Sequence, residues 1–142
     1  MIKHLRVLVV DDDVAILEVL TAHLRSKGYT VECKENARDA LDAVMRLPFD
    51  LVISDVRMAG MNGFEFVKIV RANFPGIGIV MMTAFEDEFP LAEALRAGAD
   101  GYITKPFSLS KFSLIFEHAY WHALQREDWW QLHKGEQEKG IP

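Results

Sequence analysis

Short apolar segments alternate along the chain with longer segments in which apolar residues recur at helical spacing. The short segments cover residues 5–10, 29–33, 49–54, 77–82 and 101–104, and each predicts a strand. Those at 5–10, 49–54 and 77–82 are nearly unbroken apolar runs, which is typical of parallel strands covered on both faces. The pattern therefore predicts a parallel sheet buried between two layers of helices.

A helix is predicted after each strand. Gly28 follows the first helical segment as a C-terminal cap would, Asn36 precedes the second as an N-terminal cap, and Pro75-Gly76 marks the turn after the third. Residues 108–134 can form one continuous helix. The side chains expected to face the sheet are Leu17, Leu20, Leu24, Ala37, Ala40, Leu41, Val44, Val67, Val70, Leu91, Leu95, Phe112, Phe116, Ala119 and Ala123.

Strand and helix alternate five times. Right-handed crossovers between parallel strands then produce a flavodoxin-like, doubly wound α/β fold, with a five-stranded sheet in the order 2-1-3-4-5 and five helices. We expect one such domain over residues 1–126, because 142 residues suit a single compact domain. Residues 127–142 are expected to extend the last helix and to end in a frayed tail.

The residues that follow the predicted strands carry charged or hydroxyl groups. Asp11 and Asp12 follow the first strand, Asp55 the third, Thr83 the fourth and Lys105 the fifth. In doubly wound sheets, ligands bind at the carboxyl ends of the strands, near the point where the strand order reverses. We therefore expect these side chains to meet at one edge of the sheet.

Three carboxylates gathered at one edge repel one another unless a cation lies among them. Mg²⁺ prefers oxygen ligands and commonly combines one or two carboxylates with water and a phosphate. Such an ion allows a carboxylate to attack a phosphoryl group, while Thr83 and Lys105 donate to the phosphoryl oxygens. Asp13, by contrast, is better placed to cap the following helix than to bind metal.

Composition narrows the classes of function. Half of the residues are apolar and 26% are charged, as in ordinary globular proteins. The net charge of −5 argues against a broad basic surface for direct nucleic-acid binding. The single cysteine, Cys33, excludes an internal disulfide and suits a reducing cytosol, so a cytoplasmic location is expected. No stretch approaches the roughly 18 apolar residues that span a membrane, and no membrane association is expected.

Four motifs stand out in combination: VLVVDDD (7–13), LVISDVRMAGMNG (51–63), VMMTAF (80–85) and GYITKPF (101–107). Together they resemble the response-regulator receiver family of two-component signalling, whose chemotaxis member is a single domain of this kind. The resemblance implies that Asp55 is phosphorylated by a partner histidine kinase or phosphotransfer protein in a Mg²⁺-dependent reaction. It implies a switch that catalyses its own phosphorylation and dephosphorylation, rather than a conventional enzyme.

The resemblance also implies the metal ligands. Asp12 would contact Mg²⁺ directly and Asp11 mainly through water. The phosphoacceptor Asp55 and the backbone carbonyl of Arg57 would complete the protein's share of the coordination.

A switch is implied beside the metal. Thr83 and Lys105 would bind the phosphoryl group, and small Ala84 would leave room for it. Tyr102 matches the family's aromatic switch, which turns inward when Thr83 is drawn toward the phosphate; simple packing on an edge strand is the alternative. Phosphorylation would change the surface of the fourth helix, fifth strand and fifth helix, which a downstream protein or an output domain reads.

The sequence departs from the family pattern near the phosphoacceptor. Ala59 stands where the family usually has proline, which loosens the loop by removing a φ restraint but removes no catalytic group. Arg57 and Phe85 occupy positions beside the phosphoryl group that vary within the family. We expect these bulky side chains to restrict attacking water and to slow the loss of the phosphoryl group.

The last helical segment has more aromatic side chains than one packing face needs: Tyr120, Trp121, Trp129 and Trp130. They either form a homodimer or partner contact, or fold back onto the domain itself. The surface of the fourth helix, fifth strand and fifth helix is a second candidate for a homodimer. The chain is either a stand-alone receiver or the front part of a longer regulator.

Two other classes of function compete with the receiver. Asp11 and Asp13 form a D-x-D motif that resembles haloacid-dehalogenase-type phosphatases, in which Asp11 would be the nucleophile. Ala15 stands where that motif has threonine or valine, and a late acidic pair after a strand is missing. A nucleotide-binding flavodoxin-like module is the other alternative, but the sequence has neither a P-loop nor a G-x-G-x-x-G motif.

Overall fold

The computed structural model describes residues 4–84 and 91–138, with side chains up to residue 133. Within this part of the chain, five parallel strands form one sheet in the order β2-β1-β3-β4-β5, as predicted. The strands are β1 (Arg6–Val10), β2 (Thr30–Lys34), β3 (Leu51–Asp55), β4 (Gly78–Ala84) and β5 (Gly101–Lys105).

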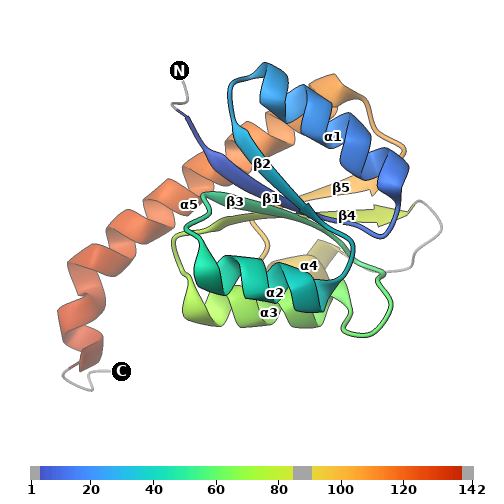
Figure 1. Ribbon diagram of the computed structural model, residues 1–142. Helices are drawn as coiled ribbons and strands as arrows, with labels where there is room; N and C mark the ends of the chain where they lie inside the picture. Colours follow the sequence, from blue (N-terminus) through green and yellow to red (C-terminus); the bar gives the residue numbers. More distant parts are fainter. Residues whose placement is uncertain (1–3, 85–90, 139–142) are drawn as a thin grey trace.

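The sheet lies between two layers of helices (Figure 1). The helices α1 and α5 cover one face, and α2, α3 and α4 cover the other. Their bounds are α1 (Val14–Ser26), α2 (Ala37–Arg46), α3 (Gly63–Asn73), α4 (Leu91–Ala97) and α5 (Leu109–Glu138). The predicted doubly wound, flavodoxin-like fold with five helices is confirmed for the described residues.

The interior strand β1 supplies core residues to both layers, because successive side chains of a strand point to opposite faces. Leu8 and Val10 pack with the α2/α3 layer, whereas Val7 and Val9 pack with the α1/α5 layer. All four side chains are fully buried. Burial on both faces explains why the sequence shows an unbroken apolar run here instead of an alternating one.

Polar caps set the helix ends that the sequence predicts. Asp13 Oδ1 accepts a hydrogen bond from the backbone N–H of Ala15 at 3.0 Å, and Asn36 Oδ1 accepts from that of Asp39 at 2.8 Å. Gly28 follows α1 with a φ of 89°, a left-handed conformation that glycine adopts without steric cost. The capping predictions for these residues are confirmed, and Asp13 is thereby committed to α1.

The prediction for α4 is wrong about its buried face. Leu91 and Leu95 are each 53% exposed, whereas Ala94 and Ala97 are buried. Both pairs have helical spacing, so the sequence pattern alone does not choose between them. The tertiary structure selects the alanines because their small side chains let α4 approach the sheet closely.

Helix α5 begins on the sheet and continues past it (Figure 1). Phe112, Phe116, Ala119 and Ala123 are buried against the sheet, as predicted. The predicted domain boundary at residue 126 falls inside this uninterrupted helix and stays a prediction. Despite the length of α5, no helix among the described residues is long and apolar enough to cross a membrane.

The aromatic residues of α5 differ in burial, and a homodimer or partner contact stays a prediction. Tyr120 is buried in the α1/α5 layer, and Trp130 lines a groove of about 470 Å³ together with Phe49 and Phe74. Trp121 and Trp129 are about half exposed. Part of the aromatic set therefore packs on the domain itself, while the other part faces outward.

Truncation of a buried leucine and of an exposed leucine should have very different effects on the free energy of unfolding. Leu24→Ala removes a side chain that is 1% exposed, and we expect it to lower the free energy of unfolding by about 2–5 kcal/mol. Leu95→Ala should change it by less than about 0.5 kcal/mol. Urea denaturation of both variants measures the difference, and equal losses would contradict the observed orientation of α4.

Candidate functional site

The carboxyl edge of the sheet collects the predicted site residues from β1, β3, β4 and β5. Asp11 follows β1, Asp55 is the last residue of β3, and Lys105 is the last residue of β5. Thr83 lies inside β4, opposite Thr104 of β5, one residue further into the strand than expected. The parallel register brings these residues to one edge, as the sequence predicts.

Three carboxylates meet at this edge. One ligand oxygen from each of Asp11, Asp12 and Asp55 lies within 4.8 Å of the others. Asp11 is fully buried and Asp55 is 7% exposed, whereas Asp12 is exposed. The set combines buried charge with access from solvent, and its oxygen donors suit a hard divalent cation such as Mg²⁺.

Lys105 bridges the two buried carboxylates. Its Nζ lies 2.7 Å from Asp11 Oδ2 and 3.5 Å from Asp55 Oδ1. Burial lowers the pKa of Lys105, but the hydrogen bond and charge of Asp11, together with the charge of Asp55, outweigh burial and raise this pKa overall. The ammonium group is thus held in its charged form between two acids.

The environment of the Asp55 carboxyl disfavours its charged form. Burial, followed by repulsion from Asp11, raises the pKa of Asp55 to about 6, against the opposing attraction of Lys105 and the N–H of Val56. That N–H donates to Asp55 Oδ1 at 3.0 Å. A cation among the three acids would relieve the repulsion and favour the ionised, nucleophilic form of Asp55.

The implied switch residues Thr83 and Tyr102 come from the neighbouring strands β4 and β5. The Thr83 side chain is almost fully buried, and its hydroxyl donates to the Ala84 carbonyl at a long 3.5 Å. Tyr102 is partly buried and packs against the hydrophobic cluster of the α2/α3 layer. Phe85 lies outside the described residues, so its expected position is not tested.

A cleft of about 470 Å³ opens beside Asp12. The exposed Arg57, with Ala59 and Asn62 of the β3–α3 loop, contributes to its lining. The cleft gives the exposed acid a partly apolar approach from the side of the loop. The loop position of Ala59 thus lies at the border of the candidate site.

Gly63, to which the sequence analysis assigned no role, allows α3 to pack closely against the end of β3. A Cβ placed on Gly63 would lie 2.1 Å from the backbone oxygen of Asp55. Only glycine allows the first turn of α3 to approach the end of β3 so closely. The Asn62-Gly63 pair at the start of a predicted helix was the available signal, and Asn62 indeed caps α3 by accepting from the N–H of Glu65 at 2.9 Å.

The family model of the response regulator receiver domain matches residues 7–116 of this chain. The chain belongs to this family. The receiver resemblance read from the four motifs is thereby confirmed, together with the two-component signalling class to which the family belongs.

The curated relatives of this chain include longer regulatory proteins. The transcriptional regulatory protein ZraR of Salmonella typhimurium is 43% identical over 116 residues, which cover 82% of this chain and 26% of that protein. This chain therefore spans about a quarter of the length of ZraR.

Solved receivers share its architecture. The chemotaxis response regulator CheY4 of Vibrio cholerae is 34% identical with a TM-score of 0.70, over 87% of this chain and 98% of that one. TrrA of Thermotoga maritima, solved in complex with Mg²⁺ and BeF, is 31% identical with a TM-score of 0.73, over 80% of this chain and 97% of that one.

The raised pKa of Asp55 predicts how the stability of the receiver changes with pH. The pKa of Asp55 is about 6 in the folded protein, and its ordinary value, which applies to the unfolded chain, is 3.8. At a pH between these two pKa values, folding is therefore accompanied by the binding of a proton. The free energy of unfolding contributed by Asp55 is therefore highest below about pH 4 and falls as pH rises through about 6.

Asp55→Asn removes this titration. The quantity to compare is the free energy of unfolding of the variant minus that of the wild type, without divalent cations. We expect this difference to rise by about 2–3 kcal/mol between pH 4 and pH 7.5. Urea denaturation across this range measures the gap, and added Mg²⁺ should narrow it by stabilising the ionised acid. Parallel pH curves for the two proteins would contradict the prediction.

Proposed function

We propose that this receiver is a phosphorylation-controlled signalling switch in which Asp55 accepts a phosphoryl group. The observation that carries the proposal is the gathering of Asp11, Asp12 and Asp55 oxygens within 4.8 Å, with Lys105 bridging the two buried acids. This arrangement has a nucleophile, a place for a cation and a fixed positive charge at one edge of the sheet. Those are the groups that phosphoryl transfer needs.

The carboxylates of Asp11, Asp12 and Asp55 are the proposed metal ligands, and the backbone carbonyl of Arg57 is the expected fourth. When bound, Mg²⁺ supplies positive charge that offsets the repulsion between the acids and the incoming phosphate. The buried Asp11 keeps its orientation because its Oδ1 accepts from the N–H of Asp13 at 2.9 Å.

In the proposed reaction, a carboxylate oxygen of Asp55 attacks the phosphorus atom of a phosphohistidine on a kinase or phosphotransfer protein. The P–N bond breaks, and the histidine nitrogen leaves with the electron pair and takes up a proton. Lys105 Nζ donates to one phosphoryl oxygen. The Thr83 hydroxyl turns away from the Ala84 carbonyl and donates to a second phosphoryl oxygen.

The signal then passes to the surface of α4, β5 and α5. Movement of Thr83 toward the phosphate would leave space that Tyr102 enters, which shifts the population of the packing around β5. A downstream protein or an output domain would read this surface, and it or the outward aromatic residues of α5 would also serve a homodimer. ZraR, named as a transcriptional regulator, is an example of a longer protein with such a domain.

The phosphatase alternative, with Asp11 as nucleophile, finds less support in the geometry. Asp11 is fully buried, its Oδ2 is held by Lys105 at 2.7 Å and its Oδ1 by the N–H of Asp13. An oxygen engaged in this way is a poor attacking group, whereas among the residues that the structure describes Asp55 Oδ1 has only the long 3.5 Å contact to Lys105 and one backbone N–H.

Phosphorylation by a small acyl phosphate tests the proposal directly. With Mg²⁺, the wild type should acquire an acid-stable, base-labile phosphoryl group detected by mass shift, and Asp55→Asn should not. Lys105→Ala should reduce the labelling rate by roughly 10²–10³-fold, as expected for the loss of one stabilising donor. The exposed Asp42→Asn is the matched control and should label normally. Labelling that persists in Asp55→Asn but is lost in Asp11→Asn would instead support the phosphatase.

The lifetime of the phosphoryl group tests the role of the residues beside it. If Arg57 and Phe85 restrict attacking water, Arg57→Ala and Phe85→Ala should each release phosphate faster. We expect an increase of roughly two- to tenfold, equivalent to at most about 1.4 kcal/mol of barrier. Phosphate release after donor removal measures the rate, and unchanged or slower release would reject the idea.

A further inference from the structure

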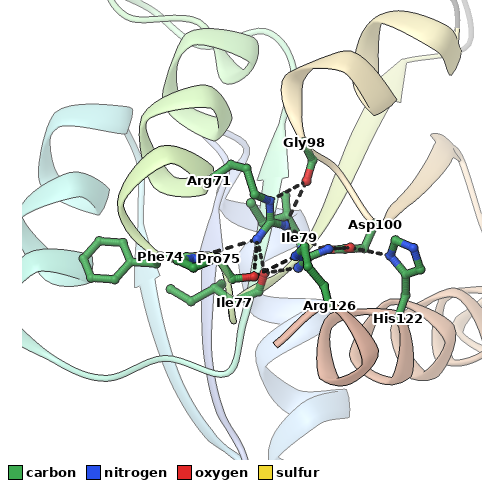
Figure 2. A network of polar contacts seen from close by, with 9 residues as sticks. All are labelled: Arg71, Phe74, Pro75, Ile77, Ile79, Gly98, Asp100, His122 and Arg126. Carbon is green, nitrogen blue, oxygen red and sulfur yellow. Dashed lines mark hydrogen bonds and ion pairs between the residues drawn. The ribbon is translucent and has the colours of Figure 1, made fainter. Parts of the chain in front are cut away.

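The carboxylate of Asp100 joins several elements at the amino edge of the sheet, the edge opposite the candidate site (Figure 2). Its side chain is fully buried. Oδ2 accepts from the backbone N–H of Ile79 at 2.9 Å and from Arg71 Nη2 at 2.8 Å. Oδ1 lies 2.6 Å from His122 Nδ1 and accepts from Arg126 Nη1. One acid therefore connects β4, α3 and α5.

The two arginines belong to opposite layers of the fold and depend on this acid. Arg71 comes from α3 and Arg126 from α5, and both contact Asp100 (Figure 2). Burial is the main cause that lowers the pKa of Arg71 to about 10. The charge of Asp100 acts against burial, and the nearby charge of Arg126 lowers this pKa further. Without the Asp100 charge, two poorly hydrated cations would face each other.

Asp100 also lies between α4 and β5. It is the residue directly before β5, and Gly98, just after the end of α4, offers its carbonyl to Arg71 Nε at 3.0 Å and Nη2 at 2.8 Å. Tyr102 follows two residues later, in β5. A displacement of α4 or of β5 must therefore change the position of Asp100 relative to α3.

The C-terminal part of α5, residues 124–138, forms an arm, and besides Trp130 in its groove, Arg126 and Glu127 give it two supports. Arg126 contacts Asp100 and also donates to the carbonyls of Pro75 and Ile77 in the α3–β4 turn, at 2.7 and 3.0 Å. Glu127 packs over that turn so tightly that a Cβ on Gly76 would lie 2.5 Å from its Oε2. Because the supports are two different segments, relative movement between them must tilt or release the arm.

We propose that Asp100 is a positioning residue that transmits displacements of α4 and β5 to the direction of the α5 arm. The contact converts a change on the switch surface into a movement of a helix that extends past the domain. Its use in signalling rests on the proposed function. The coupling itself does not, because α4 can be disturbed directly by substitution.

The first test disturbs the end of α4 without phosphorylation. A Cβ on Gly98 would lie 2.7 Å from the Arg71 side chain, whereas a Cβ on Gly60 meets nothing within 4 Å; both glycines have positive φ. Spin labels at Val19→Cys and the exposed Leu132→Cys, in a Cys33→Ser background, report the direction of the arm. Gly98→Ala should shift or broaden the distance distribution, and Gly60→Ala should leave it unchanged. Equal distributions in both variants would overturn the coupling.

The second test adds phosphorylation by acyl phosphate and Mg²⁺. The wild-type arm distance should change on phosphorylation, and Asp100→Asn should label normally but lose this response. Asp128→Asn, an equal charge change at an exposed position of the arm, should keep it. A phosphorylated wild type with a fixed arm, or an Asp100→Asn variant that responds fully, would overturn the proposal. A lack of labelling would reject the proposed function, while the glycine pair would still decide the coupling.

Discussion

Repulsion between the buried carboxylates of Asp11 and Asp55 is the constraint on which the carboxyl edge of this receiver depends. The folded chain keeps both acids buried, and it offsets their charge with the single ammonium of Lys105. One cation between two anions leaves the site net negative, and this repulsion adds to burial, the larger cause, in raising the pKa of Asp55 to about 6. The same imbalance makes the site receptive to a divalent cation.

The backbone provides the means to hold this unfavourable arrangement. The central strands are buried on both faces, so the ends of β1 and β3 cannot move apart without exposing apolar side chains. Gly63 lets α3 pack directly on the Asp55 carbonyl, and Asp13 secures both α1 and the Asp11 carboxylate. Stability gained in the core thus offsets electrostatic strain at the edge, a common arrangement in functional sites.

The amino edge of the sheet shows the opposite balance. There Asp100 is one anion among two arginines and a histidine, and its contacts hold α3, β4 and α5 together. Both β4 and β5 run between the two centres, with Thr83 and Lys105 near one end and Ile79 and Asp100 at the other. Rigid strands that connect two charged centres are a physical route by which a change at the first reaches the second.

The sequence by itself determined the strand order, the receiver family and the residues of the carboxyl edge. These follow from local patterns: apolar runs mark buried strands, and in a parallel sheet the residues after each strand share one edge. It did not determine the buried face of α4, because Leu91 and Leu95 compete with Ala94 and Ala97, and both pairs have a helical spacing.

It gave no sign of the Asp100 centre either, whose members are up to 55 residues apart (Arg71 to Arg126) and carry no motif. Only the tertiary structure decided these features. Packing distance and the meeting of charges from distant segments depend on how whole layers are arranged, and no local pattern encodes that arrangement.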